Sequence, residues 1–401
     1  MPFKRVFLII VDSFGIGEEP DAAAYDDVGS DTMGHIDEVC GPLKMPNMAR
    51  HGLFQLHTPL KTPADPNPIG VFARLQEASV GKDTTTGHWE MMGVKHDHPF
   101  ITFTDTGFPD DLIKELEEKT GHAVIGNKAA SGTTILDELA QEELDSHSRK
   151  IIVYTSADSV LQICGSEESM GLDELYRVCE IARDITMKDE WKVGRVIARP
   201  YVGNKETGFT RTPNRRDYSV KPPHKTDLNA MQEAGLDVIG IGKIHDIFDG
   251  EGITETLHSN SSIHGMQQTM EVMDRDFRGL CFVNLVDFDA KWGHRRNPQG
   301  YAKELESFDE LLGQMEQKLR DDDLVIIAAD HGNDPTFKGT DHTREQVPFL
   351  AFSKTMNKGI HLPDQTSFAQ IGATICDNFN VIRPEKSIGT SLLEEIESAK
   401  A

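Results

Sequence analysis

Three apolar runs of this chain end in acidic residues, and this pattern restricts the fold more than any other feature. VFLIIVD ends at Asp12, CFVNLVDFD ends at Asp287 and Asp289, and LVIIAADH ends at Asp330 and His331. Continuous apolar runs rich in Val and Ile are typical of strands covered on both faces, as in a parallel sheet sandwiched by helices. Ligands of such sheets bind beyond the carboxyl ends of the strands. We therefore expect these acids to meet at one edge of a sheet.

The middle of the chain has a different pattern. FPDDLIKELEEKTG, ASGTTILDELAQEEL and DELYRVCEIARDI predict amphipathic helices, which alternate with the predicted strands IIVYTSAD and GRVIARPYVG. Stretches rich in proline and turn residues at 96–100 and 211–223 are suitable joints. The sequence thus predicts an α/β core with a mostly parallel sheet, formed by residues 1–99 and 219–401. A smaller α+β cap domain is inserted into it at residues 100–218.

Composition and charge restrict the partners and the compartment. The chain has 41 Lys and Arg against 66 Asp and Glu, a formal charge of −25, whose field repels nucleic acid and anionic membranes. The apolar run in MPFKRVFLIIVDS is too short to span a membrane and no small-residue cleavage site follows it, so we expect a cytoplasmic protein. Five cysteines without CxxC spacing predict reduced thiols rather than disulfides or a zinc site. No surface pattern demands an oligomer, and we expect a monomer.

Aspartates and histidines near the strand ends form a candidate metal constellation: Asp12, Asp289, His294, Asp330, His331 and His342. Carboxylate oxygen and imidazole nitrogen without thiolate suit Mn²⁺, Mg²⁺ or Zn²⁺, and this number of ligands suits two ions better than one. The adjacent Asp330 and His331 can both be ligands only where the strand turns into a loop, which Gly332 and Asn333 favour. For a single position, a capping or turn role is the ordinary alternative, and we assign that role to Asp334 and Asp341. Three strands with the same ending favour the joint metal site.

The stretch GKDTTTGHWE, residues 81–90, is a cluster of hydroxyl side chains flanked by glycines. One interpretation is a capped helix start without chemistry. In the other, one threonine is a nucleophile, because a cation beside a hydroxyl lowers its pKa and stabilises the alkoxide. Phosphoryl transfer needs little beyond alignment and charge neutralisation, so such a threonine can attack phosphorus without a histidine base. Spacing alone does not choose among Thr84, Thr85 and Thr86.

Together these motifs resemble the phosphopentomutase family of the alkaline phosphatase superfamily. The resemblance is carried by VDSFGIG, GKDTTTGHWE, NLVDFDAKWGHRR, ADHGND and GTDHTRE, and in the middle region by ASGTTILDEL, YTSADSVLQI, VGRVIARPYVGN and FTRTPNRRDY. It implies an alkaline-phosphatase-like core and two Mn²⁺ ions per chain, with Mg²⁺ as an alternative. It implies one ion held by Asp12, Thr84, Asp330 and His331, and the other by Asp289, His294 and His342. It also implies that Thr84 is the phosphorylated residue.

The same resemblance implies a substrate and the residues that bind it. The expected reaction interconverts ribose 1-phosphate and ribose 5-phosphate, and the deoxyribose pair, in nucleoside and pentose phosphate metabolism. It runs through phosphothreonine and ribose 1,5-bisphosphate, with a sugar bisphosphate as activator. Such a site must exclude water, which a mobile cap can do. The implied phosphate-binding residues are Arg195, Arg211 and Lys243, and Asp158 is implied for a ribose hydroxyl; for each, solvation at the surface is the alternative.

Two other functions are compatible with part of this pattern. A metal-dependent phosphatase on the same scaffold would differ only in whether water reaches the phosphothreonine. A catalytically silent metal-binding protein would use the cap as an interaction surface, but every ligand and nucleophile position is filled. Arg215 and Arg216 are assigned to solvation at the surface, and His88, His96 and His98 stay structural or unassigned.

Overall fold

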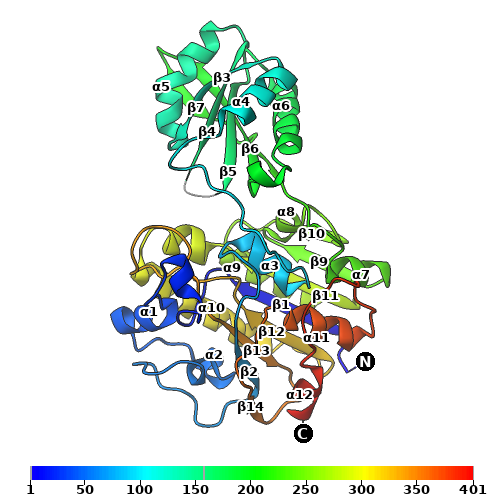
Figure 1. Ribbon diagram of the computed structural model, residues 1–401. Coiled ribbons are helices and arrows are strands. Elements are labelled where there is room, and N and C mark those ends of the chain that lie inside the picture. The colour runs from blue at the N-terminus through cyan, green and yellow to red at the C-terminus, as the bar shows by residue number, and fades with distance from the viewer. Residues whose placement is uncertain (1, 157–158, 401) are drawn as a thin grey trace. The chain divides into compact units, whose positions relative to one another are not determined.

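The chain divides into two compact units. The computed structural model describes residues 2–156 and 159–400. Unit 1 comprises Met1–His98 and Lys221–Ala401, and unit 2 comprises Pro99–Val220 (Figure 1). The joints expected from the sequence lay at 99/100 and 218/219, and the units divide at 98/99 and 220/221.

Unit 1 contains an eight-stranded sheet in the order β10-β9-β11-β1-β12-β13-β2-β14. In chain order, its strands are β1 (Arg5–Val11), β2 (Gly70–Leu75), β9 (Asp237–Ile241), β10 (Glu255–Leu257), β11 (Gly279–Leu285), β12 (Asp323–Ala328), β13 (Val347–Phe352) and β14 (Gly359–His361). The strands from β10 to β12 are parallel, whereas β13 is antiparallel to both its neighbours. The prediction of an α/β core with a mostly parallel sheet is confirmed.

Helices sandwich this sheet because its central strands are apolar on both faces. Every residue of β1, β11 and β12 is buried, which requires cover on each side. One group of helices packs around α10 and consists of α1 (Thr32–Cys40), α2 (Pro46–Arg50), α9 (Ser262–Met273) and α10 (Pro298–Glu316). A second group consists of α3 (Thr84–Met91), α7 (Asp227–Glu233), α8 (Ile244–Phe248) and α11 (Gln370–Phe379). The short α12 (Leu393–Ser398) packs beside β2, and η1 (Ala22–Tyr25) and η2 (Leu53–Gln55) are single 3-10 turns.

The register of β1 with its two neighbours brings their carboxyl ends together. Ile10 of β1 lies opposite Asn284 of β11 and Ala328 of β12. Parallel neighbours run in the same direction, so their following residues leave the sheet at one edge. Asp12 and Asp330 each come two residues after this register position. The fold therefore gathers acids from distant parts of the chain.

Unit 2 is a smaller α+β unit with a mixed sheet in the order β3-β4-β5-β6-β7, in which β8 also pairs with β6. Its strands are β3 (Ala123–Ala129), β4 (Lys150–Thr155), β5 (Val160–Ser166), β6 (Arg195–Asn204), β7 (Gly208–Arg211) and β8 (Arg216–Ser219). Its helices are α4 (Asp110–Thr120), α5 (Gly132–Asp145), α6 (Leu172–Ile185) and the 3-10 turn η3 (Asp189–Trp191). Helix α5 packs in one apolar cluster of the sheet, and α4 and α6 pack in another.

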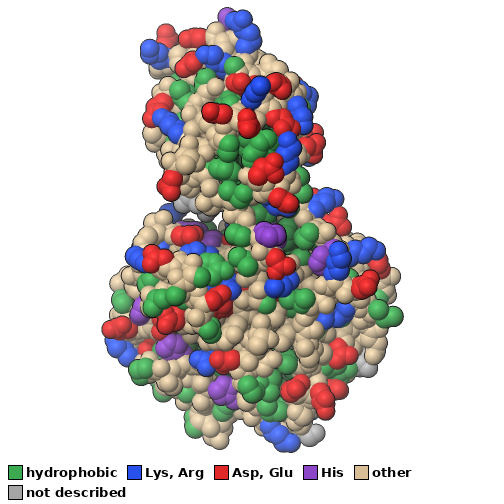
Figure 2. Space-filling model, in the orientation of Figure 1, with side chains coloured by type: hydrophobic (Ala, Val, Ile, Leu, Met, Phe, Trp, Pro, Cys, Tyr) green, Lys and Arg blue, Asp and Glu red, His purple; other side chains and the backbone are tan. Residues whose placement is uncertain are grey.

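The surface and the thiols agree with the composition. Acidic and basic side chains are interspersed on the face of each unit that Figure 2 shows. None of the helices in residues 2–156 and 159–400 combines the length and the apolar character that a bilayer crossing requires. All five cysteines are free thiols, as expected.

Candidate active site

Asp12, Asp330 and His331 form a first group at the carboxyl edge of the unit 1 sheet. All are buried, and each offers a ligand atom within 4.8 Å of the others. Asp12 Oδ2 accepts a hydrogen bond from Asn284 Nδ2 at 2.9 Å, and Asp330 Oδ1 accepts one from the Ser13 amide at 3.0 Å. Asp12 Oδ1 has no hydrogen-bond partner among the described residues, and Asp330 Oδ2 faces two ring nitrogens, His88 Nδ1 at 3.2 Å and His331 Nε2 at 3.4 Å. A cation would satisfy these oxygens, so the group fits a divalent metal.

His331 directs one ring nitrogen at these oxygens. Its Nδ1 lies 3.0 Å from the Gly332 carbonyl oxygen, which leaves Nε2 available as a ligand. Nε2 lies 3.6 Å from Asp12 Oδ1 and 3.4 Å from Asp330 Oδ2. The adjacent Asp330 and His331 both reach the site because β12 ends at Ala328 and both lie in the loop that follows.

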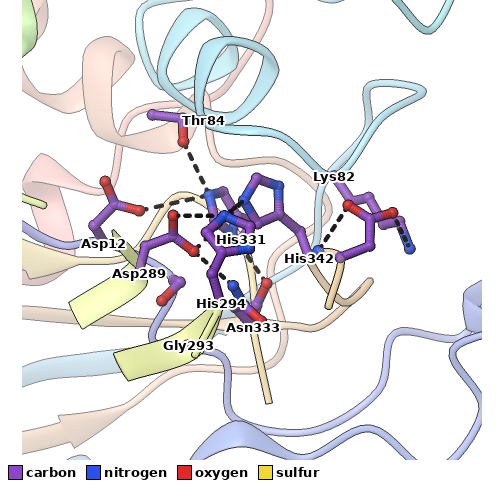
Figure 3. Close-up of polar contacts among 12 residues, drawn as sticks. Asp12, Lys82, Thr84, Asp289, Gly293, His294, His331, Asn333 and His342 are labelled. Atoms are coloured by element: carbon purple, nitrogen blue, oxygen red, sulfur yellow. Dashed lines mark hydrogen bonds and ion pairs between the residues drawn. The ribbon is translucent and has the colours of Figure 1, made fainter. Parts of the chain in front are cut away.

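Asp289, His294 and His342 form a second group beside the first (Figure 3). His294 Nε2 lies 3.1 Å from Asp289 Oδ2 and 3.1 Å from His342 Nε2. His342 Nε2 lies 3.5 Å from Asp289 Oδ1. The ring of His331 is 4.0 Å from that of His342, and it also offers a ring nitrogen to a group with Asp289 and His342. His331 therefore adjoins both groups, which are contiguous.

A π-helical turn positions Asp289 and His294. The turn, η4 (Phe288–Gly293), follows β11, and the His294 amide donates to the Asp289 carbonyl oxygen at 3.0 Å. Its five-residue hydrogen-bond spacing brings the two side chains to the same side. A Cβ on Gly293 would lie 2.8 Å from Asn333 Nδ2, which donates to Asp289 Oδ1 at 2.7 Å. Glycine thus leaves room for an amide that fixes the carboxylate.

The Thr84 hydroxyl faces the two groups of candidate ligands. Its Oγ1 lies 3.1 Å from His331 Nε2 (Figure 3). Thr86 instead donates its hydroxyl to Asp83 Oδ2 at 2.6 Å, and Asp83 caps α3 by accepting the Thr86 amide at 3.0 Å. The stretch is therefore a helix cap and also presents a hydroxyl to the site, so the two interpretations of the sequence are compatible.

Two further residues of α3 lie against the end of β12. A Cβ on Gly87 would lie 2.1 Å from the Asp330 carbonyl oxygen, so the helix approaches too closely for any side chain there. The sequence left His88 structural or unassigned. In the structure it is buried, and its Nδ1 lies 2.9 Å from the Thr84 carbonyl oxygen and 3.2 Å from Asp330 Oδ2. Its Nε2 lies 3.3 Å from Asn284 Nδ2. A single histidine on a short helix has no spacing partner that could have revealed this position.

Asp334 and Asp341 lie at turns beside the two groups. Asp334 Oδ2 accepts a hydrogen bond from the Asp31 amide at 3.0 Å. Asp341 accepts one from the His342 amide at 2.8 Å and lies 3.3 Å from Lys82 Nζ. Only the His342 amide is a local turn partner among these, and the other partners come from distant parts of the chain.

The electrostatics of the site call for added positive charge. Burial raises the pKa of Asp12 well above its ordinary value, and the neighbouring Asp330 and Asp289 raise it further. Burial also acts to raise the pKa of Asp330 and of Asp289, but nearby histidines outweigh it and both values are lowered. Burial lowers the pKa of His331, but the charges of Asp330 and Asp12 outweigh it and raise that pKa to about 9. A divalent cation would relieve the repulsion among these carboxylates.

The predicted substrate-binding residues belong to different units. Lys243 precedes α8 in unit 1, and its positive charge opposes the rise in the pKa of Asp12. Arg195 is the first residue of β6 in unit 2, whereas Arg211 lies on β7 opposite the seventh residue of β6. The backbones of Arg195 and Arg211 are therefore not neighbours, and their roles stay predictions. Asp158 lies outside the described residues.

Arg211 lies in a group of basic side chains. Its Nη1 would lie 2.7 Å from a Cβ on Gly132, the first residue of α5. The Tyr154 hydroxyl lies beside the same position, buried and without a hydrogen-bond partner among the described residues. Burial lowers the pKa of Arg199, and the charges of Arg215 and Arg211 contribute. Because a helix N-terminus repels cations and attracts anions, this arrangement suits an anion.

Comparison with known proteins gives the family. The chain matches the family model of the Metalloenzyme superfamily over residues 4–382. A phosphopentomutase of Clostridium beijerinckii is 59% identical over 394 residues, which cover 98% of this chain and 99% of that protein. Phosphopentomutases of Clostridium perfringens and Agathobacter rectalis are each 60% identical with the same coverage. The chain belongs to the phosphopentomutase family.

Membership of the phosphopentomutase family confirms the resemblance drawn from the sequence motifs. It makes the chain an enzyme of the mutase type, an isomerase, and a metalloenzyme. The alternative of a catalytically silent metal-binding protein is therefore set aside.

Proposed function

We propose that this chain interconverts ribose 1-phosphate and ribose 5-phosphate, and the deoxyribose pair, by phosphoryl transfer through Thr84. The observation that carries the proposal is the 60% identity to a phosphopentomutase over 98% of the chain. The Thr84 hydroxyl, 3.1 Å from His331 Nε2, supports a transfer role for this residue.

Two divalent ions complete the proposed site, Mn²⁺ or in its place Mg²⁺. Asp12, Thr84, Asp330 and His331 would hold one, and Asp289, His294 and His342 the other. When bound, the ions neutralise phosphoryl oxygens and stabilise the Thr84 alkoxide. Asp12 Oδ1, which has no hydrogen-bond partner among the described residues, supports this assignment.

The two-ion assignment has its own test in Asp289→Ala. This variant should lose metal and activity together, with a loss equivalent to about 4 kcal/mol of transition-state stabilisation. Metal content by plasma mass spectrometry and mutase rate are measured on the same sample. An unchanged metal stoichiometry would contradict the assignment.

In the proposed cycle, the phosphoryl group starts on Thr84 Oγ1. The bond from phosphorus to Oγ1 breaks while a hydroxyl oxygen of the bound ribose monophosphate forms a new bond to phosphorus. That hydroxyl loses its proton, and the Thr84 oxygen gains one. The resulting ribose 1,5-bisphosphate reorients within the site and returns its other phosphoryl group to Thr84. This second transfer releases the isomeric monophosphate. A sugar bisphosphate activates the enzyme because it can phosphorylate a free Thr84.

Arg195, Arg211 and Lys243 are proposed to bind substrate phosphate, and Asp158 a ribose hydroxyl. The planar fork of arginine matches pairs of phosphate oxygens. For Arg211, the N-terminus of α5 supports the proposal, as does the nearby Tyr154 hydroxyl, which has no hydrogen-bond partner among the described residues. The free thiols support a cytoplasmic location.

An assay of both products tests the proposed function. The purified protein is incubated with Mn²⁺, ribose 1-phosphate and a catalytic amount of a sugar bisphosphate, and ribose 5-phosphate and free phosphate are followed together. We expect ribose 5-phosphate without free phosphate. Free phosphate as the main product would instead establish a phosphatase on this scaffold. The Thr84→Ala variant, purified in the same way, controls for contaminating activity.

A further inference from the structure

Arg344 connects the segment that leads to Thr84 with the segment that carries His342. Its side chain is 3% exposed. Its guanidinium donates hydrogen bonds to three alternate backbone carbonyls, those of Glu77 at 2.7 Å, Ser79 at 3.1 Å and Gly81 at 2.7 Å. These carbonyls belong to the stretch that runs directly into the cap of α3. One side chain therefore fixes the path of the backbone toward the nucleophile.

Acidic side chains hold the same guanidinium in a fixed orientation. Asp21 accepts from Nε and from Nη2, both at 3.0 Å. Glu77 Oε2 accepts from Nη1 at 2.8 Å, and Glu19 Oε2 lies 3.1 Å from Nε. Only the planar fork of arginine offers enough donors in fixed directions for the carboxylates and the three carbonyls together, and a lysine ammonium does not.

The backbone of Arg344 is tied to the nucleophile segment by a second route. Its amide donates to Asp27 Oδ2 at 2.9 Å, and Lys82 Nζ lies 2.9 Å from the same oxygen. Lys82 also lies 3.3 Å from Asp341 Oδ2 (Figure 3 shows Lys82 beside His342). Asp27 therefore holds both segments, through one backbone donor and one side-chain donor.

On the other side, the segment of Arg344 is bonded to the ligand loops. Thr343 and Gly332 exchange two amide hydrogen bonds, at 2.9 and 3.1 Å, directly beside His331 and His342. The segment thus contacts ligand residues at one end and the path to α3 through the Arg344 side chain.

We infer that Arg344 is a positioning residue for phosphoryl transfer, which sets the place of the Thr84 hydroxyl relative to His331 and His342. The inference rests on the proposed function, in which Thr84 is the nucleophile. Arg344 acts through the carbonyls of residues 77–81 and through Asp27. Displacement of a nucleophile by about 1 Å lowers the rate about 100-fold. A substitution of Arg344 should therefore lower the rate of the chemical step.

A matched pair of arginines separates positioning from stability. Arg5 is also buried and also bonds a carboxylate and two backbone carbonyls, but at the amino end of β1, with partners Asp323, Met273 and Arg275. Arg5→Lys and Arg344→Lys each disrupt a buried set of bonds, and only the second set leads to Thr84. Asp27→Asn is a milder variant on the same path, and Asp323→Asn is its counterpart at the amino end.

The readout is kcat and KM for ribose 1-phosphate, with the rate of Thr84 phosphorylation by a sugar bisphosphate measured by mass spectrometry. All variants carry Mn²⁺, and rates are corrected for the folded fraction from thermal denaturation. We expect Arg344→Lys to lower kcat and the phosphorylation rate about 100-fold with KM nearly unchanged, and Asp27→Asn to lower both less. Arg5→Lys and Asp323→Asn should keep both rates.

Two contrary results have different meanings. Corrected rates for Arg344→Lys and Asp27→Asn that equal those of the amino-end variants would overturn the positioning role. A wild-type enzyme that turns over without ever carrying phosphate on Thr84 would instead overturn the proposed function.

Discussion

Both ends of strands β1 and β12 carry buried charged side chains, but only those at the amino ends form an ion pair with each other. At the amino ends, Arg5 and Asp323 form a buried pair in which two guanidinium nitrogens each lie 2.7 Å from a carboxylate oxygen. At the carboxyl ends, Asp12 keeps one buried oxygen without a hydrogen-bond partner among the described residues, and its carboxyl group lies among the acids Asp330 and Asp289. A buried charge without a counterion costs free energy. Removal of one partner from a buried ion pair destabilises the fold, because it leaves the other charge without its counterion.

The two ends of the sheet therefore have different roles. The amino ends contribute to folding, and the carboxyl ends keep an unfavourable arrangement that a bound cation relieves. Substitutions at the amino ends should therefore lower stability without changing activity, whereas substitutions at the carboxyl ends should lower activity without lowering stability.

The largest effect is expected for Thr84→Ala at the carboxyl edge. Mutase activity should fall by about four orders of magnitude or more, because the phosphoryl group has no acceptor oxygen. Metal content and the melting temperature should stay close to wild type, since the remaining ligands are intact. The product assay, plasma mass spectrometry and thermal denaturation measure the three quantities. Retained mutase activity would remove Thr84 as the nucleophile.

At the amino edge, Asp323→Asn should lower the free energy of unfolding by about 3 kcal/mol, because it leaves the Arg5 guanidinium buried without its counterion. Urea denaturation measures this loss. The kcat of the folded fraction should be unchanged, and a fall in kcat would show that the two ends are not independent.

Asp12→Asn should have the opposite effect on stability. Burial and two neighbouring acids disfavour the charged form of Asp12, so the metal-free variant should be more stable than the metal-free wild type by about 1 kcal/mol. The same variant should bind Mn²⁺ more weakly in calorimetric titration. A metal-free variant that is less stable than wild type would contradict the assigned strain.

A further effect concerns pH and the acids around Arg344. Burial raises the pKa of Glu19 from 4.5 to about 8, against the charge of Arg344. Between these values the folded state keeps a proton that the unfolded state has released, so this group's contribution to stability is full below pH 4.5 and falls as the pH rises to about 8. Glu19→Gln should flatten this part of the profile, which urea denaturation at pH 5 and pH 8 measures. Identical slopes in the two proteins would contradict the raised pKa.

The sequence alone predicted the acids at the strand ends, but it did not predict the residues that hold the site in place. Asp12 and Asp330 follow apolar runs whose length and composition indicate buried strands, so their convergence could be predicted. Asn284 lies inside such a run, where a polar residue has no periodic signal. The contacts of Arg344 depend on backbone carbonyls more than 260 positions away, and carbonyls leave no mark in a sequence. The three-residue strands β10 and β14 are likewise too short to produce a pattern.

Gly87 determines how closely helix α3 approaches the loop that follows β12. A Cβ at this position would lie 2.1 Å from the Asp330 carbonyl oxygen, whereas ordinary contact begins at 3.4 Å. Any side chain would move α3, and the Thr84 oxygen with it, outward by about 1 Å, a displacement that costs about 100-fold in rate. The reach of the nucleophile is thus set by the absence of a single methyl group.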